Sequence, residues 1–323
     1  MIELPVFPDE NWYKEAIKEL LTKRFKSVES KEGHYREITI LVNEELKRIL
    51  PPGLGKITFE DLVIAPFDEL QKMKMVLDTC GTDCFYKYKE DENGKWVRNG
   101  FRDPWNLIYK TYDKFSKYGV NTSIIKKYGI NCCPYCNEHF VFNRDLAAVA
   151  QLDHFFPRGE YPLFALCLYN LVPSCSACNH IKGKKLLGVS PHNHSLRFED
   201  LKISYRPRLS DFMAEESQFD IEFKYVGNNQ EEKKAWEENI DKLLLEKAYN
   251  YHKDYVVELI TKYRCNSNEY IETLQKQFPD IIHSVQEAKR LVYGNYIDPA
   301  DYLKRPLSKM AHDIVAELEK FVL

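Results

Sequence analysis

The sequence predicts an α+β fold, in which a mostly helical chain carries a short central module of two strands and a helix. Three observations predict it. Apolar residues recur at helical spacing on both sides of the middle, β-like runs appear near the middle, and two Cys-x-x-Cys pairs bracket them. We therefore expect an N-terminal helical region at 1–125, a central module at 126–208 and a C-terminal helical region at 209–323.

The N-terminal region is expected to be mostly helical. Residues 11–50 place apolar side chains three and four apart and predict two amphipathic helices, separated near Gly33 and ended by the PPGLGK segment. Another helix is expected at 57–80, and a turn between extended pieces at 91–96. Helical spacing returns at 104–128.

The central module is expected to begin with a hairpin. Residues 140–144 and 148–156 are two β-like runs, and the second one ends with Asp153 and His154. A loop then leads to a short helix that we expect to start near Asn179, because a polar cap residue opens this segment and a glycine closes it. Beyond the module, alternation predicts a strand in 218–225, followed by long helices from 231 to the end.

Composition places the chain among ordinary globular proteins of the cytoplasm. It has 323 residues, 44% of them hydrophobic, without an apolar stretch long enough for a membrane span or a signal-like N-terminus. Nine cysteines are too few for a disulfide scaffold. Residues 126–208 hold eleven Lys and Arg against six Asp and Glu, about +5 in a chain of net charge −3. Such a basic island fits phosphate binding, although a solvated face would look the same.

The two cysteine pairs predict a structural zinc site. Cys133 and Cys136 form one pair, and Cys175 and Cys178 form the other after 38 intervening residues. Four thiolates fill a tetrahedral zinc shell, so such a site stabilises the fold and leaves no position for a substrate. Cys132 could replace Cys133, but the two-residue spacing favours Cys133.

Between the pairs lie polar residues that suit a second, catalytic metal. Asp153 and His154 end the expected strand, and the zinc site should bring them near residues 170 to 185. The strings CPYC, LDHFFPRGEYPL and YNLVPSCSACNHIKGKK together resemble the zinc-bearing form of the HNH endonucleases, the ββα-metal superfamily. The resemblance covers roughly 60 of the 323 residues and says little about the helical regions.

The resemblance implies a role for each matched residue. Asp153 and Asn179 would bind a catalytic Mg²⁺ or Mn²⁺, with His180 as the alternative to Asn179, and His154 would be the general base. Asn170 would orient the loop and the histidine, although it could be a plain turn residue. Flanking phosphates of the nucleic acid would meet basic side chains, namely Arg158, Lys182, Lys184 and Lys185. The same lysines could instead form a solvated helix face, and Asn179 could serve only as a helix cap.

The resemblance thus implies a metal-dependent hydrolase that cleaves DNA or, as a variant, RNA. The motif is also similar to the HNH subunits of Septu-type antiphage defence systems, which work with an ABC-like ATPase partner. The alternative is a non-catalytic zinc module that binds nucleic acid or a protein through the same basic helix.

Overall fold

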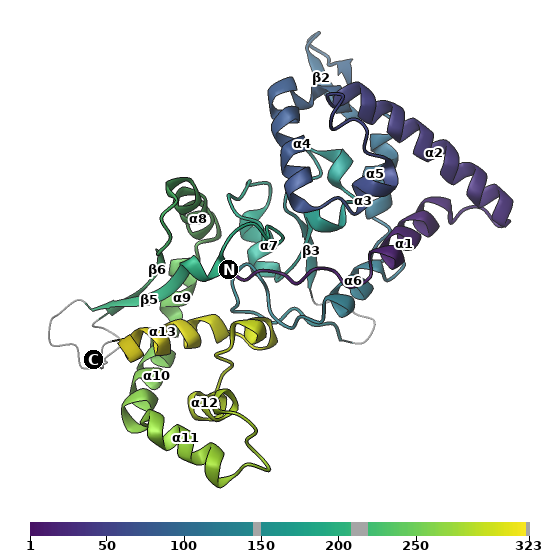
Figure 1. Cartoon of the computed structure of the whole chain (residues 1–323). Coiled ribbons are helices and arrows are strands. Elements are labelled where there is room, and N and C mark those ends of the chain that lie inside the picture. The colour runs from purple at the N-terminus through teal and green to yellow at the C-terminus, as the bar shows by residue number, and fades with distance from the viewer. Residues whose placement is uncertain (145–149, 208–218, 321–323) are drawn as a thin grey trace. The chain divides into compact units, whose positions relative to one another are not determined.

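The computed structural model describes residues 1–144, 150–207 and 219–320. Contacts divide the chain into two compact units. The N-terminal unit comprises Pro5–Gly129 and Asn143–Pro173, and the cysteine unit comprises Met1–Leu4, Ile130–Phe142 and Ser174–Leu323 (Figure 1). This division follows contacts and does not test where a functional module begins, so the three sequence regions stay predictions.

Helices make up most of the N-terminal unit: α1 (Glu10–Thr22), α2 (Val28–Ile49), α3 (Phe59–Val63), α4 (Phe67–Cys80), α5 (Trp105–Tyr112) and α6 (Val120–Tyr128), with a 3₁₀ turn at Thr82–Phe85. The first two helices do not separate at Gly33, which lies inside α2. Ser27 ends the gap between them, because its side chain accepts a hydrogen bond from the Ser30 backbone N–H and caps α2. The expected helix at 57–80 is two helices, since Pro66 starts α4.

The turn expected at 91–96 joins two antiparallel strands, β1 (Tyr86–Glu90) and β2 (Trp96–Phe101). Asp91 shapes this turn, because its carboxylate accepts hydrogen bonds from the backbone N–H groups of Asn93 and Lys95, both at 2.9 Å.

The central strands pair differently from the expected hairpin. Strand β3 (Gln151–His154) pairs with β4 (Leu171–Ser174), and Phe140 of the expected first strand forms an isolated bridge with Cys132. Residues 148 and 149 of the expected second strand lie outside the described residues. Strand β4 occupies residues that we expected to be a loop, and α7 (Ser176–Lys182) follows it directly.

Helices α4 and α5 support the end of β3. The rings of Phe155 and Phe156 lie 5.2 and 5.5 Å from the ring of Phe67 at the start of α4. Tyr112 at the end of α5 donates a hydrogen bond to the carbonyl of Leu152, at 2.8 Å. Aromatic packing of this kind fixes the strand end and the residues that it carries.

The cysteine unit combines α7 with a two-stranded antiparallel sheet, β5 (Leu201–Pro207) and β6 (Phe219–Tyr225). Its further helices are α8 (Gln230–Leu243), α9 (Leu245–Tyr249), α10 (Lys253–Cys265), α11 (Asn268–Gln277), α12 (Val285–Tyr293) and α13 (Ser308–Lys320). The expected strand at 218–225 is confirmed from Phe219 on. One core joins the sheet to the helices, through Ile203, Phe219, Tyr249 and Ile314 among others.

None of the helices within the described ranges combines the length and the apolar run that crossing a bilayer requires.

Candidate metal centre and catalytic residues

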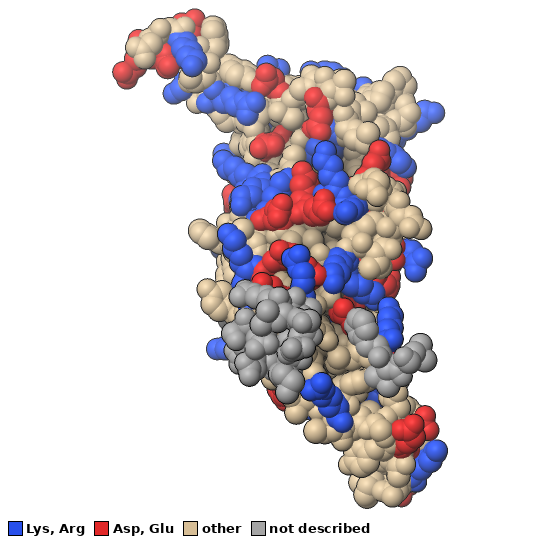
Figure 2. Space-filling view, turned by 90° about the vertical axis from the view of Figure 1, so that its left-hand side faces the viewer, with Lys and Arg blue, Asp and Glu red and all other residues tan. Residues whose placement is uncertain are grey.

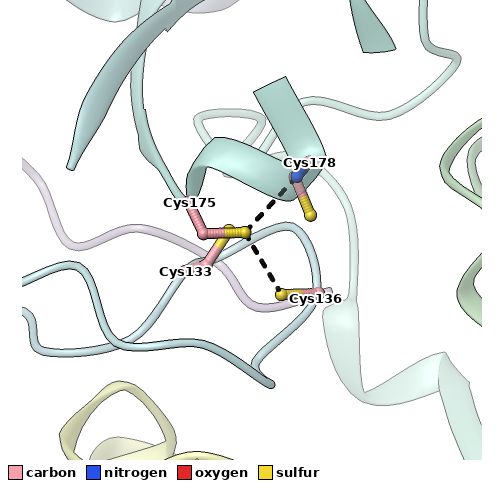
Figure 3. A group of neighbouring side chains, drawn as sticks. All are labelled: Cys133, Cys136, Cys175 and Cys178. Carbon is pink, nitrogen blue, oxygen red and sulfur yellow. Dashed lines mark hydrogen bonds between the residues drawn. The ribbon is translucent and has the colours of Figure 1, made fainter. Parts of the chain in front are cut away.

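The four predicted zinc ligands lie together in the cysteine unit. Cys133, Cys136, Cys175 and Cys178 are all buried, and their Sγ atoms lie within 4.8 Å of one another (Figure 3). The Sγ atoms of Cys136 and Cys175 are 3.9 Å apart. Tetrahedral zinc with Zn–S bonds of about 2.3 Å separates its sulfurs by about 3.8 Å. The cluster therefore fits a zinc ion.

The first cysteine pair is shaped by a tight turn. Asn137 follows the pair in the left-handed region, with φ of 54°, and its backbone N–H donates to the carbonyl of Cys133 at 2.7 Å. Asparagine tolerates this conformation better than most residues. The turn also directs the backbone N–H of Glu138 toward Cys136 Sγ, at 3.4 Å. Such N–H groups stabilise negative charge on a metal-bound sulfur.

The second pair sits at the start of α7. Cys175 is the N-cap residue, and its Sγ accepts from the backbone N–H of Cys178 at 3.4 Å (Figure 3). The helix thus begins at Ser176, three residues before the expected start, because a thiol takes the capping role that we gave to Asn179. Asn179 lies within the helix, where its backbone carbonyl accepts from the N–H of Gly183 at 2.9 Å. The simple cap interpretation of Asn179 is therefore wrong.

The thiols influence one another's protonation. Hydrogen bonds from Cys133, Cys136 and Cys178 lower the pKa of Cys175, because three donors stabilise one thiolate. The reciprocal contacts with neighbouring thiols raise the pKa of Cys136 and Cys178. A metal ion must displace the remaining protons, so the affinity of this centre should fall as the pH falls.

Asn137 fastens the cysteine turn to the C-terminal part of the same unit, a role that the sequence analysis missed. Its buried side-chain amide donates to the carbonyl of Tyr302 at 2.7 Å and accepts from the backbone N–H of Lys309 at 3.1 Å. The segment around the start of α13 is therefore bound to the turn that carries the first cysteine pair. The sequence signal that could have indicated this role is the asparagine directly after the first cysteine pair.

Two further side chains beside Cys136 were also missed. His139 Nδ1 lies 3.8 Å from Cys136 Sγ, and this contact raises the pKa of His139 to about 9. Glu138 lies beside His139, with 3.6 Å between a carboxylate oxygen and Nδ1, and its other oxygen is 3.0 Å from His252 Nε2.

Asp153 and His154 end strand β3 in the N-terminal unit, as expected. His154 is partly exposed, and its Nε2 lies 3.0 Å from the carbonyl oxygen of Ala165. A carbonyl only accepts, so Nε2 carries the proton, and in the neutral ring the basic lone pair is on Nδ1. The ring of Tyr112 packs edge-on at 4.3 Å. Asp153 is 4% exposed, and its negative charge adds to burial in raising the pKa of Tyr112.

Asn170 is fully buried and holds the loop that follows His154. Its side-chain oxygen accepts from the backbone N–H of Phe156 at 2.8 Å, and its amide nitrogen donates to the carbonyls of Phe156 and Phe164, both at 3.1 Å. The Asn170 carbonyl also accepts from the N–H of Phe155 at 2.8 Å. Asn170 is therefore a loop-fixing residue rather than an isolated turn residue. Its part in catalysis stays a prediction.

We expect Asn170→Ala to destabilise the N-terminal unit. The change leaves a buried N–H and two carbonyls without this partner, at a cost of about 3 kcal/mol in the free energy of unfolding. For a unit of this size the melting temperature should fall by about 6–12 °C. Thermal unfolding followed by circular dichroism measures this, with Asn93→Ala in the exposed β1–β2 turn as the control. Equal melting temperatures for the two variants would contradict the assigned role.

The predicted basic contacts differ in exposure. Lys182 is fully buried, so its expected contact with flanking phosphates is not supported by its position, whereas Lys184 and Lys185 are exposed. Lys182 is the last residue of α7. Arg158 pairs with Asp113 at 2.7 Å and lies over the ring of Tyr109. Figure 2 shows acidic and basic side chains intermixed over the face in view.

The structure thus brings together two groups of predicted residues within separate units. The four cysteines share the cysteine unit with Asn179 and His180, while Asp153, His154 and Asn170 share the N-terminal unit with Arg158. The joint binding of one ion by Asp153 and Asn179 stays a prediction.

Comparison with known proteins gives one limited likeness. The chain is 40% identical over 47 residues to protein ea31 of Escherichia phage lambda, a match that covers 15% of this chain and 14% of that protein. The chain therefore spans only a small part of the length of this relative. No protein-family model and no solved structure matches the chain.

Proposed function

We propose that this protein is a metal-dependent endonuclease of the HNH type, which hydrolyses phosphodiester bonds of nucleic acid, with DNA as the favoured substrate. The observation that carries the proposal is the arrangement at the end of β3. There a histidine with a defined tautomer follows a buried aspartate, and a buried asparagine fixes the loop beyond them.

In this proposal His154 acts as the general base. The Ala165 carbonyl holds the ring in place, since it accepts the Nε2 proton. The unprotonated Nδ1 then takes a proton from the attacking water. Asn170 maintains this geometry indirectly, because it holds the Phe156 and Phe164 backbone on the loop that contains Ala165.

Asp153 and Asn179, with His180 as the alternative, would hold the catalytic Mg²⁺ or Mn²⁺. Carboxylate and amide oxygens are the ligands that these hard ions prefer, and Asp153 offers a carboxylate at the end of β3. The ion would supply charge stabilisation for the scissile phosphate and for the leaving oxygen. These oxygen donors differ chemically from the four thiolates. A chelator should therefore be able to remove the catalytic ion and leave the zinc in place.

Lys184 and Lys185 after α7, together with Arg158, are the proposed phosphate contacts. Lys184 and Lys185 are exposed, whereas Arg158 would have to exchange its ion pair with Asp113 for a phosphate. Contacts of this kind give salt-sensitive binding without sequence preference.

Incubation of the purified chain with plasmid, single-stranded DNA and total tRNA tests the proposal. We expect cleavage with added Mg²⁺ or Mn²⁺ and none with a chelator that leaves the zinc in place. The substrate that is cut identifies the nucleic acid. Binding without cleavage of all three, in either ion, would favour a non-catalytic zinc module instead.

We further propose that the nuclease is the effector of a prokaryotic antiphage system and is controlled by an ABC-like ATPase. The support is the resemblance of the central motif to the Septu-type subunits. Affinity purification from the native host should recover an ATPase with this chain. Strong cleavage by the isolated chain, unchanged when the ATPase is added, would contradict control by such a partner.

A further inference from the structure

A second group of metal-binding side chains adjoins the four-cysteine cluster. Cys136, Glu138 and His139 each present one ligand atom, and these atoms lie within 4.8 Å of one another. All three belong to the cysteine unit, on and just after the turn of the first cysteine pair. Neither Glu138 nor His139 has a part in the proposed nuclease chemistry.

The spacing of these atoms is compatible with a common ion. The distance from Cys136 Sγ to His139 Nδ1 is 3.8 Å, and from His139 Nδ1 to the Glu138 carboxylate is 3.6 Å. The second distance is longer than an N–H···O hydrogen bond. A tetrahedral zinc ion separates sulfur and nitrogen ligands by about 3.5 Å and nitrogen and oxygen ligands by about 3.4 Å.

The surroundings of these atoms are those of an accessible metal site. The His139 side chain is 50% exposed, so an ion can reach it, whereas the Glu138 side chain is 16% exposed and held. His252 at the start of α10 holds it, through the 3.0 Å contact between its Nε2 and Glu138 Oε1. A hydrogen-bonded outer partner of this kind orients a ligating carboxylate.

Charge also favours a cation at this position. A zinc ion with four thiolates carries a net charge of −2, and the four cysteines that would hold it are buried. A second cation beside Cys136 would offset that charge at short range. Thiolate, imidazole and carboxylate together suit zinc among the common ions.

We propose that Cys136, Glu138 and His139 form a second zinc site, in which the Cys136 thiolate bridges the two ions. The three protein ligands leave one position for water. The proposal rests on a metal in the four-cysteine cluster and is independent of the nuclease proposal. The competing explanation is a protonated His139 that donates a hydrogen bond to the Cys136 thiolate beside a single zinc.

Metal counting separates these explanations. The chain would carry Asp153→Ala, which removes the proposed catalytic ion, and would be saturated with Zn²⁺ at a chelator-buffered free concentration before the bound zinc is measured. We expect two zinc ions per chain, and one after His139→Ala or Glu138→Gln. The exposed His194→Ala is the control and should keep two. One zinc ion per chain when His139 and Glu138 are unchanged would overturn the proposal. Two zinc ions per chain in the double variant of His139 and Glu138 would overturn it as well.

Cobalt tests the shared thiolate. The first Co²⁺ equivalent should give the intense thiolate-to-cobalt absorption of a four-sulfur site. If Cys136 bridges, the second equivalent changes this band in the Asp153→Ala chain. It leaves the band unchanged when Glu138→Gln is added, a change that keeps all four cysteines. A second bound ion that leaves the band of the Asp153→Ala chain unaltered would show that Cys136 is not shared.

Discussion

Replacement of His154 by alanine should abolish most of the divalent-dependent cleavage. A positioned general base contributes about 10²–10⁴-fold to the rate, and alanine removes the imidazole that would accept the proton of the attacking water. His154→Gln should lose as much activity, because glutamine still offers an N–H toward the Ala165 carbonyl but has no basic nitrogen. The initial rate of plasmid cleavage in Mg²⁺ and in Mn²⁺ measures both.

Asp153→Ala completes the test of this site. We expect a comparable loss that higher Mn²⁺ reverses only in part, since the variant lacks a metal ligand rather than the base. The surface variant His283→Ala should cleave like the parent chain. Full activity in His154→Ala and His154→Gln, at unchanged melting temperature, would show that another residue activates the water.

The local parts of the fold were predictable from sequence, and the long-range parts were not. Helical periodicity found most helices, and Asp91 with its glycine-containing turn marked the β1–β2 connection. The partner of β3 is β4, because strand pairing depends on which chain segments meet in space rather than on neighbouring residues. Strand β5, the partner of β6, was not predicted.

The metal centre shows the same division. A Cys-x-x-Cys spacing is a local signal, so two pairs sufficed to predict four neighbouring thiols. The surroundings of Cys136 depend on His252, which reaches Glu138 from 114 residues away in the chain. The burial of Lys182 was equally hidden, because sequence shows a lysine in a basic run but not the packing around it.

Loss of the four-cysteine centre should unfold or strongly destabilise the cysteine unit. The centre joins the start of α7 to the first cysteine turn, and Asn137 on that turn holds the backbone before α13, at Tyr302, and in its first turn, at Lys309. A ligand at a thousandfold excess over its dissociation constant contributes about 4 kcal/mol to the free energy of unfolding. Cys133→Ser should therefore lower the melting temperature by about 8–16 °C or leave the unit unfolded. Circular dichroism and the zinc content of the purified variant measure this.

The controls separate the structural metal from the catalytic one. Cys265→Ser, at an exposed cysteine on α10, should keep both zinc and melting temperature. A strong zinc chelator should lower the melting temperature of the parent chain to that of Cys133→Ser, whereas it should leave the variant nearly unaffected. The cysteine thiols must lose their protons to bind zinc. The parent chain should therefore lose zinc and melt at a lower temperature as the pH falls. A Cys133→Ser protein with parental stability and zinc content would indicate that the buried Cys132 takes its place as the fourth ligand.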